Sequence, residues 1–480
     1  MKKYFAIIAI AVAALTGCKD FLEEAPILSQ SDVLTLSTFD GLDKTVAGAY
    51  APLASSSWYG SDWILYNEMK TSNGKKYIGS SFDSGRLNDY YNINYAPNNT
   101  SGVYSAAYYV ISTVNNVMDA MDETKGTEKD RNNIKAECLF LRALSHFDAV
   151  LTYAQPYCFT ADASHDGIPT VFHTESDARP ERASVKEVYD MVIADLLEAE
   201  KIIDPKYVRA GVTDVNAVVS LPVIQALLSR VYLYKGDWQN AAEYATKVID
   251  CGKYELWNAT DLKEAACYCQ DCGSKEVIFE VYASTGNSYD PNGDHVGLFS
   301  MTTPYGYADA GCSTDIINLY ETSDARLGLY MVDESGSCFF TAKDLGKGLY
   351  ASDDPVNTIV IRLSEMYLNR AEALINGAKV KDAEGVDISP AADLALIASS
   401  RGASAQTATP SGVALERQKE LAWEGHLFFD LGRTKTDMTR VDVGADNIIK
   451  NLPWGDDRWA MPIPEHETNA NKNIKQNPGY

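Results

Sequence analysis

The sequence predicts a mostly α-helical protein. Helical pairs like those of tetratricopeptide (TPR) repeats form the scaffold, and long irregular loops with a few short strands carry the ligand site. Apolar side chains recur at spacings of three and four residues in several segments, which is the spacing of one helix face. These segments come in neighbouring pairs. The pair around Gly236 has a small-residue turn and alanines at the expected helix crossing, as in a TPR unit.

The N-terminal part begins with one expected helix from Thr38 or Asp40 to about Ala54, with Asp40 as its N-cap. Residues 57–101 are rich in Gly, Ser, Asn and Tyr and show little periodicity. A stretch of this length without clear elements indicates a functional loop region. The helical spacing of apolar residues returns over residues 103–121, where we expect the next helix.

Three helical pairs and a closing helix follow. The expected pairs are 136–150 with 185–203, 224–231 with 238–249, and 361–375 with 391–398, and the closing helix is 413–430. Residues 251–360 differ, because they contain β-branched runs such as 276–282 and long loops, especially 283–314. The chain is therefore expected to contain a signal peptide (1–17), an N-terminal TPR-like region (18–250) and a C-terminal region with inserted loops (251–480).

The first 17 residues predict export. Two lysines precede an apolar run from Phe5 to Ala14, which is too short for a membrane-spanning helix of roughly 20 residues. Small residues then lead directly into Cys18, as in the lipidation signal of bacterial lipoproteins; the alternative is an ordinary secretory signal. Acylated Cys18 would anchor the mature chain. No later segment is apolar for 18 residues, so the lipid is the only membrane anchor expected.

The composition is strongly acidic. The chain has 42 basic and 66 acidic side chains, and removal of the signal peptide leaves 40 basic ones and a net charge of −26. Such a surface repels nucleic acid and anionic lipid headgroups, so no nucleic-acid partner is expected. The 29 tyrosines and 7 tryptophans offer rings that stack on sugars, although core packing accounts for most of them.

Two patterns suggest a metal site, and neither matches a known ligand set well. Cys267, Cys269 and Cys272 form a tight cluster whose best fourth ligand is Cys251, but a local disulfide or free thiols are the stronger interpretation. Residues 290–301 have the 1-3-5 spacing of a calcium loop but lack its glycine and its final glutamate. The sequence therefore predicts no metal and no cofactor.

The C-terminal third contains three blocks that resemble the SusD/RagB family. They are RLSEMYLNRAEAL at 362–374, ERQKELAWEGHLFFDLGR at 416–433, and the ending that joins MPIP at 461–464 to QNPGY at 476–480. The helix at 136–147 and the segment that starts at Cys18 are similar to earlier blocks of that family. One departure is His426, where the family usually has Arg.

This resemblance implies a role. Members of the family are outer-membrane lipoproteins that face outward, bind nutrients and cover a TonB-dependent (SusC-like) β-barrel transporter, to which they pass the ligand. Most known ligands are glycans and some are peptides, and the members are not enzymes. We therefore expect a cell-surface lipoprotein that binds an oligosaccharide. The alternatives are a peptide ligand, a surface glycan hydrolase, or a TPR scaffold that joins envelope proteins.

Three glutamates decide whether the hydrolase alternative has support. Glu416, Glu420 and Glu424 are spaced at i, i+4 and i+8 on one predicted helix face, which could form an acid/base pair or a metal site. Structural ion pairs are the stronger interpretation, and the arginines available for them are Arg362, Arg417 and Arg433. The chain also lacks an H-E-x-x-H motif, a P-loop and a G-x-S-x-G motif.

A sugar site needs an aromatic platform with hydrogen-bonding neighbours. Two loop-like stretches, 77–95 and 287–309, combine tyrosines with Asn and Asp, and two tryptophans lie in the preceding loop region. The candidate ligand-binding residues are Trp58, Trp63, Tyr77, Tyr90, Tyr91, Tyr95, Tyr289, Tyr305 and Tyr307.

Overall fold

The computed structural model describes residues 35–175, 177–212, 214–262, 275–282, 301–304, 307–343, 357–445 and 448–480. Several predictions concern residues outside these ranges, namely the signal peptide, Cys18, Tyr289, Tyr305, the cysteine cluster at 267–272 and most of the loop at 290–301. In the described part of the chain, no helix has both the length and the apolar character needed to cross a membrane.

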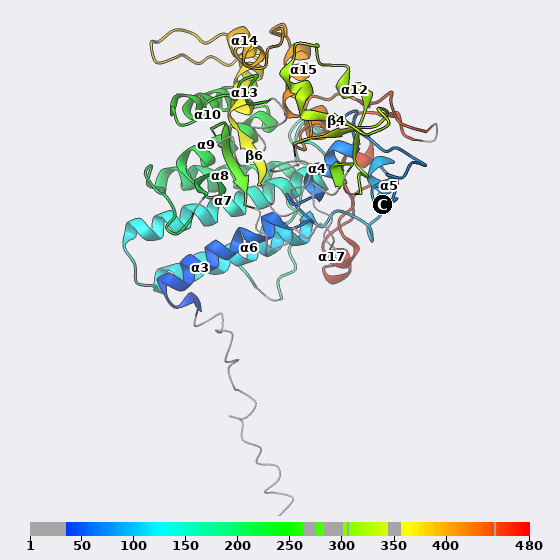
Figure 1. Cartoon of the computed structure of the whole chain (residues 1–480). Helices are drawn as coiled ribbons and strands as arrows, with labels where there is room; N and C mark the ends of the chain where they lie inside the picture. The colour runs from blue at the N-terminus through cyan, green and yellow to red at the C-terminus, as the bar shows by residue number, and fades with distance from the viewer. Residues whose placement is uncertain are drawn as a thin grey trace, which may run out of the picture.

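Most of the molecule is a continuous stack of helices (Figure 1). Each helix of the stack packs against the next, which confirms the mostly α-helical fold with TPR-like pairs. In order, the stack contains α3 (Phe39–Ala49), α6 (Val103–Ala120), α7 (Glu128–Tyr153), α8 (Val185–Ile202), α9 (Leu221–Lys235), α10 (Trp238–Asp250), α13 (Leu363–Ile375) and α14 (Pro390–Ser400). Shorter helices complete the fold: α4 (Asp62–Met69), α5 (Asn88–Tyr91), α12 (Thr314–Ile317), α15 (Pro410–Leu421), α16 (Leu427–Arg433) and α17 (Glu465–Ala470).

Local signals determine where these helices begin and end. Ser184 and Glu187 form a capping box that starts α8. Gly236 ends α9 with a φ of +79°, a left-handed conformation that glycine adopts without a steric penalty. The Asp237 side chain then accepts the Asn240 N–H and starts α10. A left-handed glycine followed at once by a new N-cap gives the tight turn of a TPR-like pair.

The strands are few and short. An antiparallel sheet in the order β1-β3-β5-β4 consists of β1 (Gly74–Lys75), β3 (Gly311–Cys312), β5 (Phe339–Thr341) and β4 (Tyr330–Val332). The predicted strand at 276–282 is β2 (Val277–Val281), which pairs antiparallel with β6 (Thr358–Arg362). A third pair joins β7 (Met438–Thr439) to β8 (Asn451–Leu452). In Figure 1, β4 and α12 lie on the side of the molecule away from α3 and α6.

Three boundaries differ from the sequence predictions. The N-cap of α3 is Thr38, whose hydroxyl accepts the Gly41 N–H, and Asp40 lies inside the first turn. The region 57–101 is not a continuous loop, because it contains α4, β1 and α5. The expected helix at 413–430 is broken between α15 and α16, where Trp423 and Gly425 have φ values of +65° and +80°.

The main core draws on both predicted regions, from Leu42 on α3 to Ile474 near the C-terminus. The last residues are fixed to this core by hydrogen bonds. Asn477 Nδ2 donates to the carbonyl oxygens of Tyr153 on α7 (2.8 Å) and Met461 (2.6 Å). The Tyr480 hydroxyl donates to the Ala460 carbonyl at 3.2 Å. Residues from both regions therefore form one packed body.

Candidate functional site

The three glutamates of the C-terminal block lie in a buried cluster of charged residues, which we call the charge cluster. Its side chains come from residues in or directly beside β2, η7 (Ala325–Leu329), β5, β6, α14 and α15. The cluster contains five carboxylates and five cations: Glu276, Asp324, Glu416, Glu420 and Glu424 with Arg326, Lys343, Arg362, Arg401 and Lys419.

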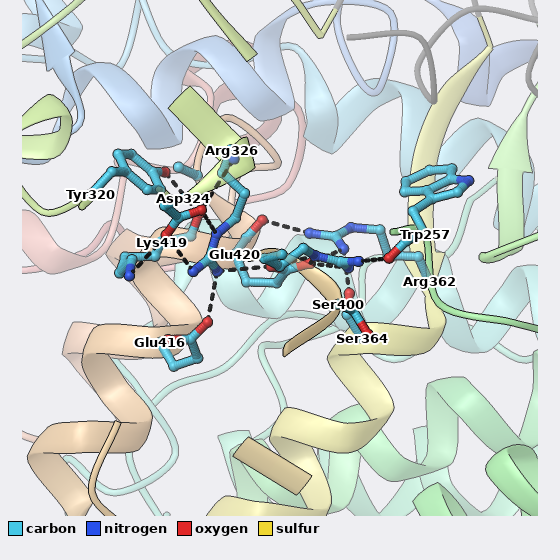
Figure 2. Close-up of polar contacts among 12 residues, drawn as sticks. Trp257, Tyr320, Asp324, Arg326, Arg362, Ser364, Ser400, Glu416, Lys419 and Glu420 are labelled. Atoms are coloured by element: carbon cyan, nitrogen blue, oxygen red, sulfur yellow. Dashed lines mark hydrogen bonds and ion pairs between the residues drawn. The ribbon is translucent and has the colours of Figure 1, made fainter. Parts of the chain in front are cut away.

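Glu420 lies at the centre of the charge cluster (Figure 2). It accepts hydrogen bonds from Arg326 (2.9 Å), Arg362 (2.6 Å) and Arg401 (2.6 Å). Burial alone would raise the pKa of Glu420, but the three guanidinium groups outweigh it and hold this pKa well below its ordinary value. Similarly, Arg362 and Lys343 overcome burial and lower the pKa of Glu424 to about 2. The two carboxylates are therefore ionised and paired.

This arrangement confirms the structural interpretation of the three glutamates. Each is at most 8% exposed and forms an ion pair with a buried cation, which is the environment of a structural carboxylate. Arg362 was the correct partner for Glu420 and Glu424. The other expected partners, Arg417 and Arg433, instead pair with Asp430 and Glu372 on α16 and α13.

Five candidate rings lie in the core. Trp58, Trp63, Tyr90, Tyr91 and Tyr95 are at most 8% exposed, and the structure assigns them to packing. Three of them have protein partners for their polar atoms: Trp58 Nε1 donates to the Asp148 carboxylate, and the Tyr91 and Tyr95 hydroxyls donate to backbone carbonyls, each at 2.9 Å. A ring covered by protein in this way offers no open face to a sugar.

Tyr77 and Tyr307, the other candidates within the described ranges, border one surface beside the β1-β3-β5-β4 sheet. We call it the loop surface and define it by Tyr77, Phe82, Arg86 and Tyr307. Phe82 and Tyr77 both pack against Phe340 of β5, with ring centroids 5.3 and 5.8 Å from its ring. Arg86 and Tyr307 are more open, with 41% of the Arg86 side chain and 40% of Tyr307 exposed.

The sheet fixes Tyr77. Its hydroxyl donates to the Cys312 carbonyl of β3 (2.9 Å) and accepts the Phe339 N–H of β5 (2.6 Å). The ring crosses β3 at Gly311, where a Cβ atom would lie 2.3 Å from the ring. Glycine is needed at this position because any side chain would displace Tyr77. One end of the loop surface is therefore rigid.

Arg86 and Tyr307 form the open end. The Arg86 guanidinium carbon lies 4.0 Å from the centroid of the Tyr307 ring, within the range of a cation–π contact. Beneath this pair, Asp309 has a fully buried side chain, 3.7 Å from an Arg86 nitrogen. The Asp309 carboxylate also accepts hydrogen bonds from the Ser84 N–H (2.6 Å) and the Ser84 hydroxyl. It thus links the loop 76–87 to the segment 307–309.

The backbone between Tyr307 and Asp309 is strained. Ala308 is buried and has a φ of +54°, a left-handed conformation that costs a non-glycine residue about 1–2 kcal/mol. This conformation occurs between an exposed ring and a buried carboxylate. Strain of this kind is concentrated at functional sites, where the surrounding structure maintains it.

Sequence reasoning did not select Phe82 or Arg86 as site residues. A signal was available for Arg86, because it is the only cation between Gly79 and Leu87 in a loop rich in serine and glycine. Among the described residues, no three His, Cys, Asp or Glu side chains group as metal ligands would. The described cysteines, which include Cys251, are free thiols.

The helical stack and its loop surface define a class of protein, a TPR-like scaffold with a small sheet and aromatic loop residues on one side, of which Tyr307 is exposed. Two family profiles match the sequence. "Starch-binding associating with outer membrane" matches residues 20–233, and "SusD family" matches residues 340–480. The chain belongs to the SusD/RagB family.

Individual relatives agree with this assignment. SusD-like protein P2 of Formosa agariphila is 26% identical over the full length of both chains. The crystal structure of a SusD superfamily protein from Bacteroides vulgatus has a TM-score of 0.80 and 25% identity, over 92% of this chain and 98% of its own. A laminarin binding SusD-like protein has a TM-score of 0.72 and 22% identity, over 92% and 99% of the two chains, and therefore shares the fold.

Proposed function

We propose that this protein is a lipoprotein of the outer membrane, anchored through Cys18 and exposed on the cell surface. It binds an oligosaccharide at the loop surface and passes it to a SusC-like TonB-dependent transporter. The observation on which the binding proposal chiefly rests is the exposed Arg86–Tyr307 pair, held from beneath by buried Asp309.

The chemistry of the loop surface suits a sugar. Aromatic rings stack on the apolar faces of pyranose rings, and guanidinium N–H groups donate to sugar hydroxyls. Tyr307 supplies an exposed ring, and Ser80, Ser81 and Ser84 add exposed hydroxyl-bearing residues beside Arg86. The family membership supports a binding role, and one protein of the same fold is described as laminarin binding.

Calorimetric titration of the mature lipoprotein in detergent would test the binding site. The panel contains laminarin, malto-oligosaccharides, xylan and mannan fragments, and mixed peptides. We expect one glycan class to bind, and expect Tyr307→Ala or Arg86→Ala to weaken binding at least tenfold, or about 1.4 kcal/mol. Tyr109→Ala on α6 is the matched control, because Tyr109 is 63% exposed and lies outside the loop surface.

Two results would contradict the proposed site. If peptides bind and free oligosaccharides do not compete, the ligand class is wrong. If Tyr307→Ala and Tyr109→Ala have equal effects, the loop surface is not the binding site. A heat signal for glycans that disappears only in the loop-surface variants would support both parts of the proposal.

The anchor and the transporter need separate tests. Mass spectrometry of the N-terminal peptide should find acyl chains on Cys18, and Cys18→Ala should release the protein from the membrane fraction. After gentle solubilisation at native expression, the protein should purify together with a large β-barrel. Isolation of the protein alone under these conditions would contradict the transporter role.

A further inference from the structure

We propose that the loop surface selects neutral glycans over glycans that carry carboxylate or sulfate groups. This inference rests on the proposed glycan-binding function and specifies its ligand class. The structural basis is charge compensation, since each described cation beside the loop surface already has a carboxylate partner from the chain. Among the described residues, an anionic sugar would therefore find no cation there without a carboxylate partner.

The described part of this surface contains three such cations. They pair as Lys75 with Asp442, Lys76 with Asp83 at 2.9 Å, and Arg86 with Asp309 at 3.7 Å. Asp309 also lies 4.0 Å from the Lys76 ammonium, so one buried carboxylate faces two cations. The side chains of Lys76 and Asp309 are almost completely buried, and water screens their interactions less than those of exposed charges.

A sugar carboxylate that approached Arg86 would also approach Asp309. Repulsion from Asp309 then offsets part of the Coulomb attraction to Arg86, because the two charges are only 3.7 Å apart. The net charge of −26 on the mature chain adds a long-range repulsion. A neutral glycan avoids both effects.

A neutral sugar needs only a ring face and hydrogen-bond donors. The Arg86 guanidinium makes no hydrogen bond to another described residue, because its distance to Asp309 exceeds hydrogen-bond length. Its N–H groups can therefore donate to hydroxyl groups of a sugar stacked on Tyr307. Asp309 is then a positioning residue, which acts by neutralising Arg86 and by holding Ser84.

The first test is a titration of the wild-type mature lipoprotein in detergent. Its neutral probes are laminarin, malto-oligosaccharides, xylan and mannan fragments, and its acidic probes are oligogalacturonate and alginate oligosaccharides. We expect binding of a neutral probe, at least tenfold weaker binding of both acidic probes, and an affinity for the neutral probe that is unchanged between about 50 and 500 mM NaCl.

The outcomes separate this inference from the proposed function. Tighter binding of an acidic probe, with an affinity that falls as salt increases, would overturn the selectivity and leave glycan binding intact. Absence of binding to any saccharide would overturn the proposed function and this inference together. These measurements need no variant and so do not depend on a substitution that might prevent folding.

The second test changes the charge beneath Arg86. Asp309→Asn leaves Arg86 without its carboxylate and should raise the ratio of acidic to neutral affinity at least tenfold. Asp309→Glu should return the ratio toward the wild-type value. Asp119→Asn on α6 removes the same charge elsewhere and is the control. An equal ratio in Asp309→Asn and Asp119→Asn would overturn the inference.

Discussion

Replacement of Lys70 by methionine is expected to stabilise the protein, and the gain should be largest below pH 7. Lys70 follows α4, is 2% exposed and forms no ion pair with a described residue. Its ammonium lies 3.9 Å from the ring centroid of Phe428 and about 6 Å from the rings of Phe429 and Tyr95. A buried charge without a carboxylate partner opposes folding.

The size of the effect follows from the proton affinity of Lys70. Burial lowers its pKa from 10.5 to about 7. Between these two values the unfolded chain holds a proton that the native state has released, so stability increases with pH across this window. Below pH 7 the charged side chain costs about 5 kcal/mol, at about 1.4 kcal/mol per tenfold change in proton affinity.

Urea denaturation at pH 6, 8 and 10 would measure this difference. Methionine matches most of the lysine stem, so a change in packing should alter stability by less than about 1.5 kcal/mol. We expect Lys70→Met to exceed the wild type by about 3–5 kcal/mol at pH 6 and by much less at pH 10. Lys253→Met removes an exposed lysine and controls for the loss of charge. A Lys70→Met effect that is equal at pH 6 and pH 10 would refute the reasoning.

Three further predictions concern stability. Glu420→Gln should lower the free energy of unfolding in urea by about 3–5 kcal/mol, because it leaves buried guanidinium groups without their shared carboxylate. The control Glu198→Gln, in an exposed ion pair, should lower it by less than about 1 kcal/mol, and equal losses would contradict the role of the charge cluster. Burial lowers the pKa of His146 and of His426 to about 4, so stability should fall as the pH drops from 6.5 toward 4. An NMR titration should find both imidazoles neutral at pH 5. If they are protonated at this pH, the two side chains are not buried as the structure shows. Gly425→Ala should lower the free energy of unfolding by more than about 1 kcal/mol, because Gly425 has a φ of +80° and the added Cβ would lie 3.2 Å from the Trp63 ring. An unchanged melting temperature would argue against this backbone conformation.

The long helices were predictable because their signal is local. The apolar spacing around Phe140 and Phe147 is contained in one segment, and Gly236 marks a turn from its neighbours alone. The break after α15 was missed because no proline marks it and the residues on both sides continue a helical pattern. Its cause is the left-handed backbone at Trp423 and Gly425, which tertiary contacts maintain.

The site was harder to predict because its contacts join distant parts of the chain. The Tyr91 hydroxyl donates to the Val443 carbonyl, 352 positions away, so no local pattern could reveal that this loop tyrosine is buried. Arg326 lies 90 positions before its partner Glu416. Residue type alone suggested Tyr77 and Tyr307 as candidates, but only the fold brings Arg86 and Asp309 beside Tyr307.

The attachment of the last residues to α7 has a consequence for the timing of folding. Asn477 bonds to Tyr153 across 324 positions of sequence. At a synthesis rate of about 5–20 residues per second, the end of α7 waits roughly 15–65 s on the ribosome before this partner is made. The native contacts between α7 and the C-terminus therefore cannot form while the helical stack is being synthesised. Such a delay suits a chain that, by the interpretation of its first 17 residues, crosses a membrane before it folds.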